Sequence, residues 1–171
     1  MTNFDRALGL MLGHEGGLSD HALDRGGRTN LGVTQATYDA WRRKQGVPIR
    51  KVDQITADET RSIYRADYWD ACRCDEYPWW LAYATFDAAV NSGPVRAIKW
   101  MQQGIGVPAD GLIGPKTLAA VRRASPPMLF GVVKARADFI SDLVRRSPSQ
   151  LVFLKGWIRR LFDVTKGALD L

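Results

Sequence analysis

The stretch from Trp79 to Val90 constrains the fold more than any other part of the chain, because nearly all of its side chains are apolar. Its apolar members are Trp79, Trp80, Leu81, Ala82, Ala84, Phe86, Ala88 and Ala89. Pro78 suits the first turn of a helix that would begin here. A helix that is apolar on most of its sides must be enclosed by other elements. The sequence therefore predicts a central helix over residues 79–90, surrounded by the rest of the chain.

Helical periodicity and capping signals account for most of the remaining residues. Thr2 and Asp5 form a capping pattern before the apolar stripe of Phe4 to Leu12, and Thr56 to Glu59 is a capping box for a helix that continues toward Trp69. Further helices are expected after Thr34 up to Gly46, over 97–105, from Pro115, before Ser147-Pro148 and from about Ser149. We therefore expect a mostly α protein.

The β signal is confined to residues 18–33. There, Gly26-Gly27 lies between two short extended segments, the second of which ends at Thr34. A chain of 171 residues corresponds to one domain, or to one domain with a small appendage. The pattern predicts a helical body with a small β-hairpin lobe.

One carboxyl group precedes this hairpin signal and a second lies within it. Glu15 stands at the end of the first helix, just before Gly16-Gly17, where the helix dipole disfavours a negative charge by about 0.3–1 kcal/mol. Asp24 follows nine residues later beside Arg25 and Arg28, which favour its ionised form. One neutral and one ionised carboxyl group are what the hydrolysis of a glycosidic bond requires.

Spacing alone does not identify this pair, but the surrounding residues resemble a known family. The motif from His14 to Gly17, followed by the glycines, threonines and asparagine between Asp24 and Thr34, resembles the signature of glycoside hydrolase family 108. That family comprises phage endolysins and related bacterial muramidases with a lysozyme-like fold. Segments 86–94, 97–102, 110–117 and 156–160 resemble its C-terminal peptidoglycan-binding region.

The resemblance implies two regions packed as one globule, a lysozyme-like catalytic region over 1–92 and a helical peptidoglycan-binding region over 93–171. The cleft between the helical body and the hairpin lobe would hold the active site. The implied reaction is hydrolysis of the β-1,4 bond between N-acetylmuramic acid and N-acetylglucosamine. Glu15 carries over as the general acid, and Asp24 as the base, nucleophile or stabiliser of the transition state.

A third catalytic side chain, a hydrogen-bonding threonine, is also implied. Both Thr29 and Thr34 fit the motif, and the sequence does not separate them. A strict count by the offset of smaller phage lysozymes falls on Asn30, which we expect to contact substrate.

Three further side chains are candidates for binding the sugar. Tyr68 and Trp69, near a helix end, are aromatic side chains suited to stacking on a sugar face, although aromatic residues more often belong to the core. Asn91 could donate to an N-acetyl group, or it could cap the helix that breaks at Gly93-Pro94.

The net charge of +6 fits an anionic partner: a wall polymer, a nucleic acid or a membrane surface. The resemblance implies bacterial peptidoglycan as this partner. We expect no nucleic acid, because no basic recognition helix or base-stacking motif occurs. The terminal helix carries Lys155, Arg159 and Arg160 opposite apolar residues, which allows weak contact with an anionic surface. No run of eighteen apolar residues occurs, so stable membrane insertion is not expected. We expect a monomer.

The remaining signals are mostly negative. Cys72 and Cys74 are too close for an unstrained disulfide and are expected to be reduced thiols. His14 and His21 lack the spacing of a zinc motif, so neither a metal nor a cofactor is expected. The first residues lack a basic n-region, so we expect synthesis in the bacterial (host) cytoplasm without a cleaved leader and action in the periplasm or wall after release. A muramidase that assists a secretion system and a non-catalytic peptidoglycan-binding module remain alternatives.

Overall fold

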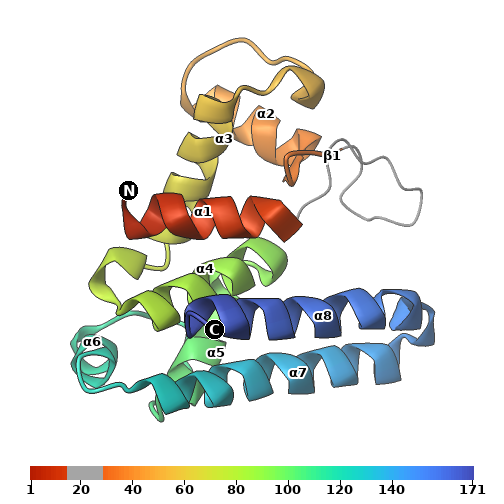
Figure 1. The fold of residues 1–171 in the computed structure, drawn as a ribbon. Coiled ribbons are helices and arrows are strands. Elements are labelled where there is room, and N and C mark those ends of the chain that lie inside the picture. The colour runs from red at the N-terminus through yellow and green to blue at the C-terminus, as the bar shows by residue number, and fades with distance from the viewer. Residues whose placement is uncertain (15–28) are drawn as a thin grey trace.

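The computed structural model describes residues 1–14 and 29–171. Helix α1 (Asn3–His14) lies between an upper lobe and a helical bundle (Figure 1). The upper lobe contains β1 (Thr29–Asn30), β2 (Val33–Thr34), α2 (Gln35–Lys44) and α3 (Ala57–Tyr64). The bundle contains α4 (Trp79–Ser92), α5 (Pro94–Gly104), α6 (Pro115–Val121), α7 (Leu129–Arg146) and α8 (Leu151–Ala168). The mostly α fold with one small hairpin, predicted from the sequence, is confirmed.

Short helices connect these elements. A π-helix (Arg65–Asp70) continues α3, and 3-10 helices span Val52–Gln54, Cys74–Glu76, Pro126–Met128 and Pro148–Gln150. Cys74 is the first residue of the second of these 3-10 helices, and Cys72 lies two residues before it. Both are free thiols and both are buried. Burial, together with a hydrogen bond to Cys72, raises the pKa of Cys74 well above its ordinary value.

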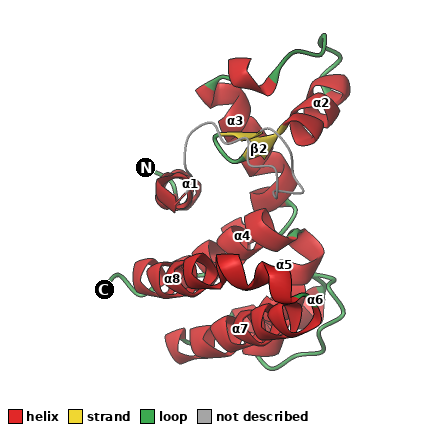
Figure 2. Cartoon of the chain, turned by 90° about the vertical axis from the view of Figure 1, so that its right-hand side faces the viewer, coloured by secondary structure: helices red, strands yellow, loops and turns green. Residues whose placement is uncertain are grey.

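Helix α4 is the centre of the molecule, as its composition predicts. Every residue from Trp80 to Ala89 is buried. The helix packs against α1 on one side and against α5, α7 and α8 on others, and Figure 2 shows it between α1 and the lower helices. An all-round apolar helix is stable only when its whole circumference is covered, and this arrangement covers it.

The predicted helix starts are confirmed where the structure describes them. Thr2 Oγ1 accepts from the Asp5 amide at 3.1 Å, and the Thr2 amide donates back to the Asp5 carboxylate at 3.2 Å. The same reciprocal pair joins Thr56 and Glu59 at the start of α3. Thr34 caps α2 by accepting from the Thr37 amide at 3.1 Å. Each cap satisfies amides that have no partner within the helix.

The hairpin differs from the prediction. The expected turn at Gly26-Gly27 lies outside the described residues. The second extended segment, predicted to continue to Thr34 as one strand, is itself a two-stranded hairpin whose turn is Leu31-Gly32. Both turn residues have positive φ, +50° and +73°, as a two-residue hairpin turn requires. The sequence contains no signal for this turn, because leucine rarely adopts the positive φ that Leu31 has here.

A buried polar cluster fixes α2 against α3. The Glu59 carboxylate accepts from the hydroxyl of Tyr38 at 2.9 Å and from Arg42 at 2.7 Å, and it also pairs with Arg50. Burial alone would raise the pKa of Glu59, but hydrogen bonds from Thr56, Tyr38 and Arg50 outweigh it and lower that pKa. This cluster makes the upper lobe a firm support for the hairpin.

Helices α5 and α7 cross at two glycines. A Cβ added at Gly131 would lie 2.9 Å from the Cα of Gly104, and one at Gly104 would lie 2.6 Å from the backbone nitrogen of Val132. Neither position has space for a side chain. The small residues therefore allow the two backbones to approach closely and bury the α5–α7 interface.

Candidate active site

The candidate site lies where α1 ends and the hairpin begins. Helix α1 runs to His14, and the predicted catalytic pair, Glu15 and Asp24, lies outside the described residues. The structure does describe the two elements that adjoin them in the chain. Phe4, Ala7 and Met11 are fully buried, so α1 is held firmly against the core up to its last turn.

Thr29 and Thr34, the two candidates for the catalytic threonine, are paired residues of the hairpin. They lie directly opposite each other in the antiparallel register, next to the pair Asn30 and Val33. Opposite residues share a face of the sheet, and neighbouring residues on a strand alternate faces. Val33 is 2% exposed and points into the core, so the two threonines share the other face.

The two hydroxyls differ in their structural duties. Thr34 Oγ1 accepts from the Thr37 amide to cap α2 and makes a second hydrogen bond, of 3.0 Å, with the Thr37 hydroxyl. Thr29 lies in strand β1. The strand register therefore brings both candidates to one face of the hairpin, and the hydroxyl of Thr34 also caps α2.

Asn30 lies on the core-facing side of the hairpin, with Val33. Its side-chain amide donates to the carbonyls of Val52 and Asp53 at 3.4 Å each. These contacts join the hairpin to the 3-10 helix Val52–Gln54. The structure therefore gives Asn30 a positioning role on the side of the hairpin opposite the two threonines.

Tyr64, at the end of α3, anchors the hairpin turn. Its hydroxyl donates to the carbonyl of Leu31 at 2.9 Å, and its ring meets that of Phe86 in α4 edge to face, with ring centroids 6.3 Å apart. The side chain is 1% exposed. The sequence could not reveal this role of Tyr64, since a hydroxyl that reaches a distant turn leaves no signal in periodicity.

The two aromatic candidates of the π-helix, Tyr68 and Trp69, differ in burial. Tyr68 is half-buried beside Tyr64, with ring centroids 5.6 Å apart, and burial, followed by the charge of Asp67, raises the pKa of its hydroxyl. Trp69 is 0% exposed, packs edge to face on Phe4 and Phe86, and donates its indole N–H to Asp75. The prediction of Trp69 as a sugar-binding residue is wrong, because a side chain enclosed in the core offers no face to a ligand.

Asn91 is exposed in the last turn of α4. Its amide donates to the carbonyl of Asp87 at 2.8 Å, so it satisfies the end of its own helix. It also lines a cavity between α4, α5, α7 and α8. Helices α1 and α4 pack together and both end toward the same side of the molecule (Figure 1).

One charged cluster in the bundle was not anticipated. Asp87, 0% exposed in the middle of α4, accepts from Arg136 of α7 at 2.6 Å and from Arg160 of α8 at 2.9 Å. Burial alone would raise the pKa of Asp87, but the charges and hydrogen bonds of both arginines outweigh it and lower that pKa. An aspartate inside an otherwise apolar helix is the signal that could have shown a buried ion pair.

Among residues 1–14 and 29–171, no group of three or more histidine, cysteine or acidic side chains could hold a metal ion. The same part of the chain contains no helix with the length and apolar character to cross a membrane.

Comparison with known proteins assigns these features to a family. Residues 8–93 match the family described as "Glycosyl hydrolase 108". A solved structure, titled "Structure of Brucella abortus SagA", is 38% identical, with a TM-score of 0.83 over 98% of this chain and 94% of that one. The chain belongs to glycosyl hydrolase family 108. As a member of this family it is a glycoside hydrolase with the lysozyme-like α+β fold, as the resemblance of its motifs implied.

A second match covers the bundle. Residues 96–162 match a family described as "Predicted Peptidoglycan domain". This assigns peptidoglycan as the polymer to which the C-terminal helices bind. Comparison with curated proteins finds no match.

Proposed function

We propose that this family 108 glycoside hydrolase is a muramidase that cleaves the β-1,4 bond between N-acetylmuramic acid and N-acetylglucosamine in bacterial peptidoglycan. The observation that carries the proposal is the union of a family 108 region and a peptidoglycan region in one chain, which meet between residues 93 and 96. A glycosidase joined to a peptidoglycan-binding bundle acts on the glycan strand of that polymer.

In the proposed mechanism, Glu15 is the general acid. It directly follows His14, the last residue of α1. The negative end of the helix dipole disfavours the ionised carboxylate there and keeps the group ready to donate its proton to the leaving oxygen. Asp24, next to Arg25 in the sequence, would stay ionised and act as base, nucleophile or stabiliser of the oxocarbenium-like transition state.

We assign the third catalytic position to Thr29. Thr29 shares a face of the hairpin with Thr34, whose hydroxyl already caps α2, and of the two threonines it lies nearer to Asp24 in the sequence. Its hydroxyl would orient the attacking water or the Asp24 carboxylate. Tyr68, half-buried beside the hairpin anchor Tyr64, is the aromatic side chain that we assign to the sugar.

Clearing of purified cell walls tests the proposal. Wild-type protein should clear a turbid wall suspension, and Glu15→Gln should reduce the rate by at least about 100-fold, because general acid catalysis contributes on that scale. Glu76→Gln is the matched control, since Glu76 is exposed and pairs only locally with Arg73 among the described residues. Equal clearing by wild type and Glu15→Gln would disprove the assignment of the acid.

The bond itself is tested by the products. A muramidase releases fragments with N-acetylmuramic acid at the reducing end, which mass spectrometry after borohydride reduction identifies. Reducing N-acetylglucosamine ends would assign the other glycosidic bond. Walls that bind the protein but release no fragments would assign a non-catalytic peptidoglycan-binding module.

The biological setting that we propose is lysis of a bacterial host by a phage endolysin. A bacterial muramidase that opens the wall for a secretion system would use the same chemistry. The two settings differ in when the enzyme reaches the wall, so expression during phage growth, or from a bacterial chromosome beside secretion genes, distinguishes them.

A further inference from the structure

Helix α8 lies at the edge of the bundle and packs on one side against α4 and α7 (Figure 2). Its buried residues, Leu161, Val164 and Ala168, mark this inward side. At about 100° per residue, all of its exposed residues fall within one arc of roughly 160° on the other side. This outward side of α8 is therefore open to solvent from Leu151 to Lys166.

The outward side of α8 has large apolar side chains. Phe162 is 72% exposed and Val152 is 70% exposed, and Leu151 and Ile158 are exposed as well. Leu151, Ile158 and Phe162 lie seven and then four residues apart, so they form one apolar stripe along the helix. Proteins rarely leave large apolar side chains uncovered in a contiguous row, and such a patch marks an interaction surface.

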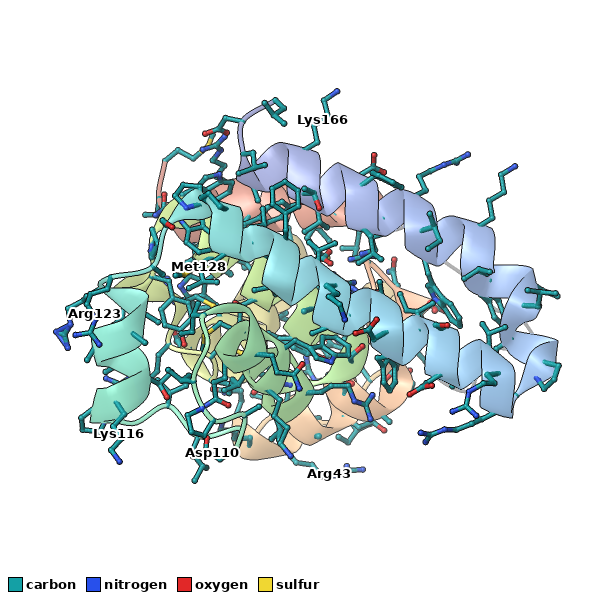
Figure 3. All side chains as sticks on the ribbon, turned by 90° about the horizontal axis from the view of Figure 1, so that it is seen from below. Arg43, Asp110, Lys116, Arg123, Met128 and Lys166 are labelled. Atoms are coloured by element: carbon teal, nitrogen blue, oxygen red, sulfur yellow. The ribbon has the colours of Figure 1, made fainter. Side chains whose placement is uncertain are left out.

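A stripe of cations runs beside the apolar stripe. Lys155, Arg159 and Lys166 lie four and then seven residues apart, and all three are exposed. Lys166 points away from the bundle in Figure 3. Among the residues that the structure describes, no acid forms an ion pair with any of the three, and no exposed residue of α8 is acidic. The outward side thus presents three positive charges next to its apolar residues.

The neighbouring helix α7 arranges its exposed charges differently. Lys134 pairs with Asp138 at 2.6 Å, and Arg145 and Arg146 both lie within ion-pair distance of Asp142. Most of the exposed positive charge of α7 is therefore matched within that helix. The positive charge of α8 has no such match and is directed to the outside of the molecule.

The structure also changes which basic residues belong to this surface. The sequence pattern places Arg160 with Lys155 and Arg159, but the Arg160 side chain is only 13% exposed and pairs with Asp87 inside the bundle. The same pattern sets the cations opposite the apolar residues. In the folded chain α8 instead has two apolar sides, one packed in the bundle and one exposed beside the cations.

The combination of charge and apolar area selects the partner. In a two-fold dimer the same surface would meet itself, so Lys155, Arg159 and Lys166 would face identical cations. A dissolved polyanion would pair with the cations but would gain nothing from Phe162. The surface of a bilayer with anionic lipids offers both phosphates for the cations and an apolar acyl boundary just beneath them.

We propose that the outward side of α8 binds the surface of a bilayer that contains anionic phospholipid. The helix would lie in the plane of the interface, with its apolar stripe at the acyl boundary and its cations at the level of the phosphates. From Leu151 to Lys166 it extends about 22 Å, so the three cations reach separate headgroups. The contact is peripheral, and it would hold the enzyme at a membrane that borders the wall.

Co-sedimentation of the full chain with lipid vesicles tests this inference. The anionic vesicles contain phosphatidylglycerol and phosphatidylethanolamine in equal parts, and vesicles of phosphatidylcholine alone are the neutral comparison. We expect saturable binding to the anionic vesicles and about 100-fold weaker binding to the neutral ones, because each cation near an anionic surface contributes about fivefold. Raising NaCl from about 0.1 M to about 1 M should weaken binding, since the screening length falls from about 10 Å to about 3 Å.

Two triple variants locate the cations. Replacing the three cations of α8 by glutamine should weaken binding to anionic vesicles by about 100-fold. The matched control replaces Lys116, Arg122 and Arg123, three exposed cations at α6, of which Lys116 and Arg123 are seen to point outward in Figure 3. Both variants lower the net charge equally, but the α6 variant should bind within about threefold of wild type. Because all six side chains are exposed, both variants should fold.

A single pair of variants tests the apolar stripe. Phe162→Gln should weaken vesicle binding by about tenfold, because a ring that enters the acyl boundary leaves water. Phe130→Gln is the matched control, since Phe130 is 60% exposed at the start of α7, outside both stripes. Its binding should change less than about twofold.

Equal binding to anionic and neutral vesicles, no binding to either, or equal behaviour of the two triple variants would overturn the inference. Full binding by Phe162→Gln, with loss of binding in the α8 triple variant, would assign the surface to a polyanion and not to a bilayer. A dimer in sedimentation velocity that Phe162→Gln dissociates, without vesicle binding, would assign it to a second copy. Clearing of lipid-free walls is measured separately, so failure of either vesicle binding or wall clearing leaves the other result intact.

Discussion

Asp87 of α4 and Arg136 of α7 are joined by a 2.6 Å hydrogen bond with the carboxylate 0% exposed, so the central helix is tied to the bundle by a charge that no solvent reaches. Asp87→Asn keeps the volume but leaves two partly buried guanidinium groups without their carboxylate. Breaking a buried ion pair in this way typically costs 3–5 kcal/mol. We expect a loss of about 3 kcal/mol or more in the free energy of unfolding, measured in urea.

The control for this prediction is Asp138→Asn. Asp138 pairs with Lys134 on the exposed face of α7, with side chains 62% and 75% exposed, so its loss should cost less than about 0.5 kcal/mol. Equal effects of the two substitutions would contradict the role assigned to Asp87.

Stability should fall at acid pH, and Asp87 should be one source of that fall. Its folded-state pKa lies below the ordinary value of 3.8, so the unfolded chain binds a proton at this site before the folded protein does. The contribution is therefore complete above about pH 5 and is lost progressively as pH falls further. Glu59, whose pKa is likewise lowered from 4.5, adds to the same trend.

Unfolding free energies measured between pH 7 and pH 3 test this. The wild-type curve should bend downward below about pH 4.5, and the Asp87→Asn curve should be flatter at its acid end. Parallel curves would show that Asp87 is not linked to proton binding in the way the structure implies.

Substitution of Thr29 and of Thr34 by alanine should separate an effect on catalysis from an effect on helix capping. Thr34→Ala removes the cap of α2 and should lower stability by about 1 kcal/mol. Thr29→Ala should reduce wall clearing by about tenfold or more, because its hydroxyl is proposed to orient water or Asp24. Urea unfolding and clearing rates measured on both variants give the comparison, and loss of activity in Thr34→Ala alone would reverse the assignment.

Tyr64→Phe should loosen the hairpin from the body. It removes the 2.9 Å donor to the Leu31 carbonyl and should cost about 1 kcal/mol, with clearing reduced severalfold under conditions where the protein is fully folded. Tyr77→Phe is the matched control, because the buried Tyr77 hydroxyl has no hydrogen-bond partner among the residues that the structure describes. Similar clearing by the two variants would contradict the positioning role of Tyr64.

The α5–α7 crossing should not tolerate a side chain. Gly131→Ala places a Cβ 2.9 Å from the Gly104 backbone and should cost about 1–3 kcal/mol through overpacking. Gly156→Ala in α8 places a Cβ with no atom of the described residues within 4 Å and should stabilise the protein by up to about 1 kcal/mol through helix propensity. Thermal unfolding of both variants checks the pair, and a gain in stability at Gly131 would refute the close crossing.

Much of this architecture was readable from local patterns. The central helix followed from a nearly continuous apolar run, and the starts of α1, α2 and α3 followed from capping residues that act within one turn of the chain. Family motifs also pointed to the glycosidase and to the peptidoglycan region before the fold was known. Such signals survive in sequence because periodicity and caps depend on neighbours only a few residues apart.

The chain alone, then, determined a mostly helical glycoside hydrolase and a short set of candidate residues. The tertiary structure decided what those candidates do. Trp69 and Tyr68 are adjacent and both aromatic, yet one is enclosed by Phe4 and Phe86 while the other stays half-buried. Thr29 and Thr34 became distinguishable only through their pairing and the cap. The Asp87 cluster joins three helices from distant parts of the sequence. Burial and charge pairing depend on residues that folding brings together. Because these residues lie far apart along the chain, no local sequence pattern reveals their contacts.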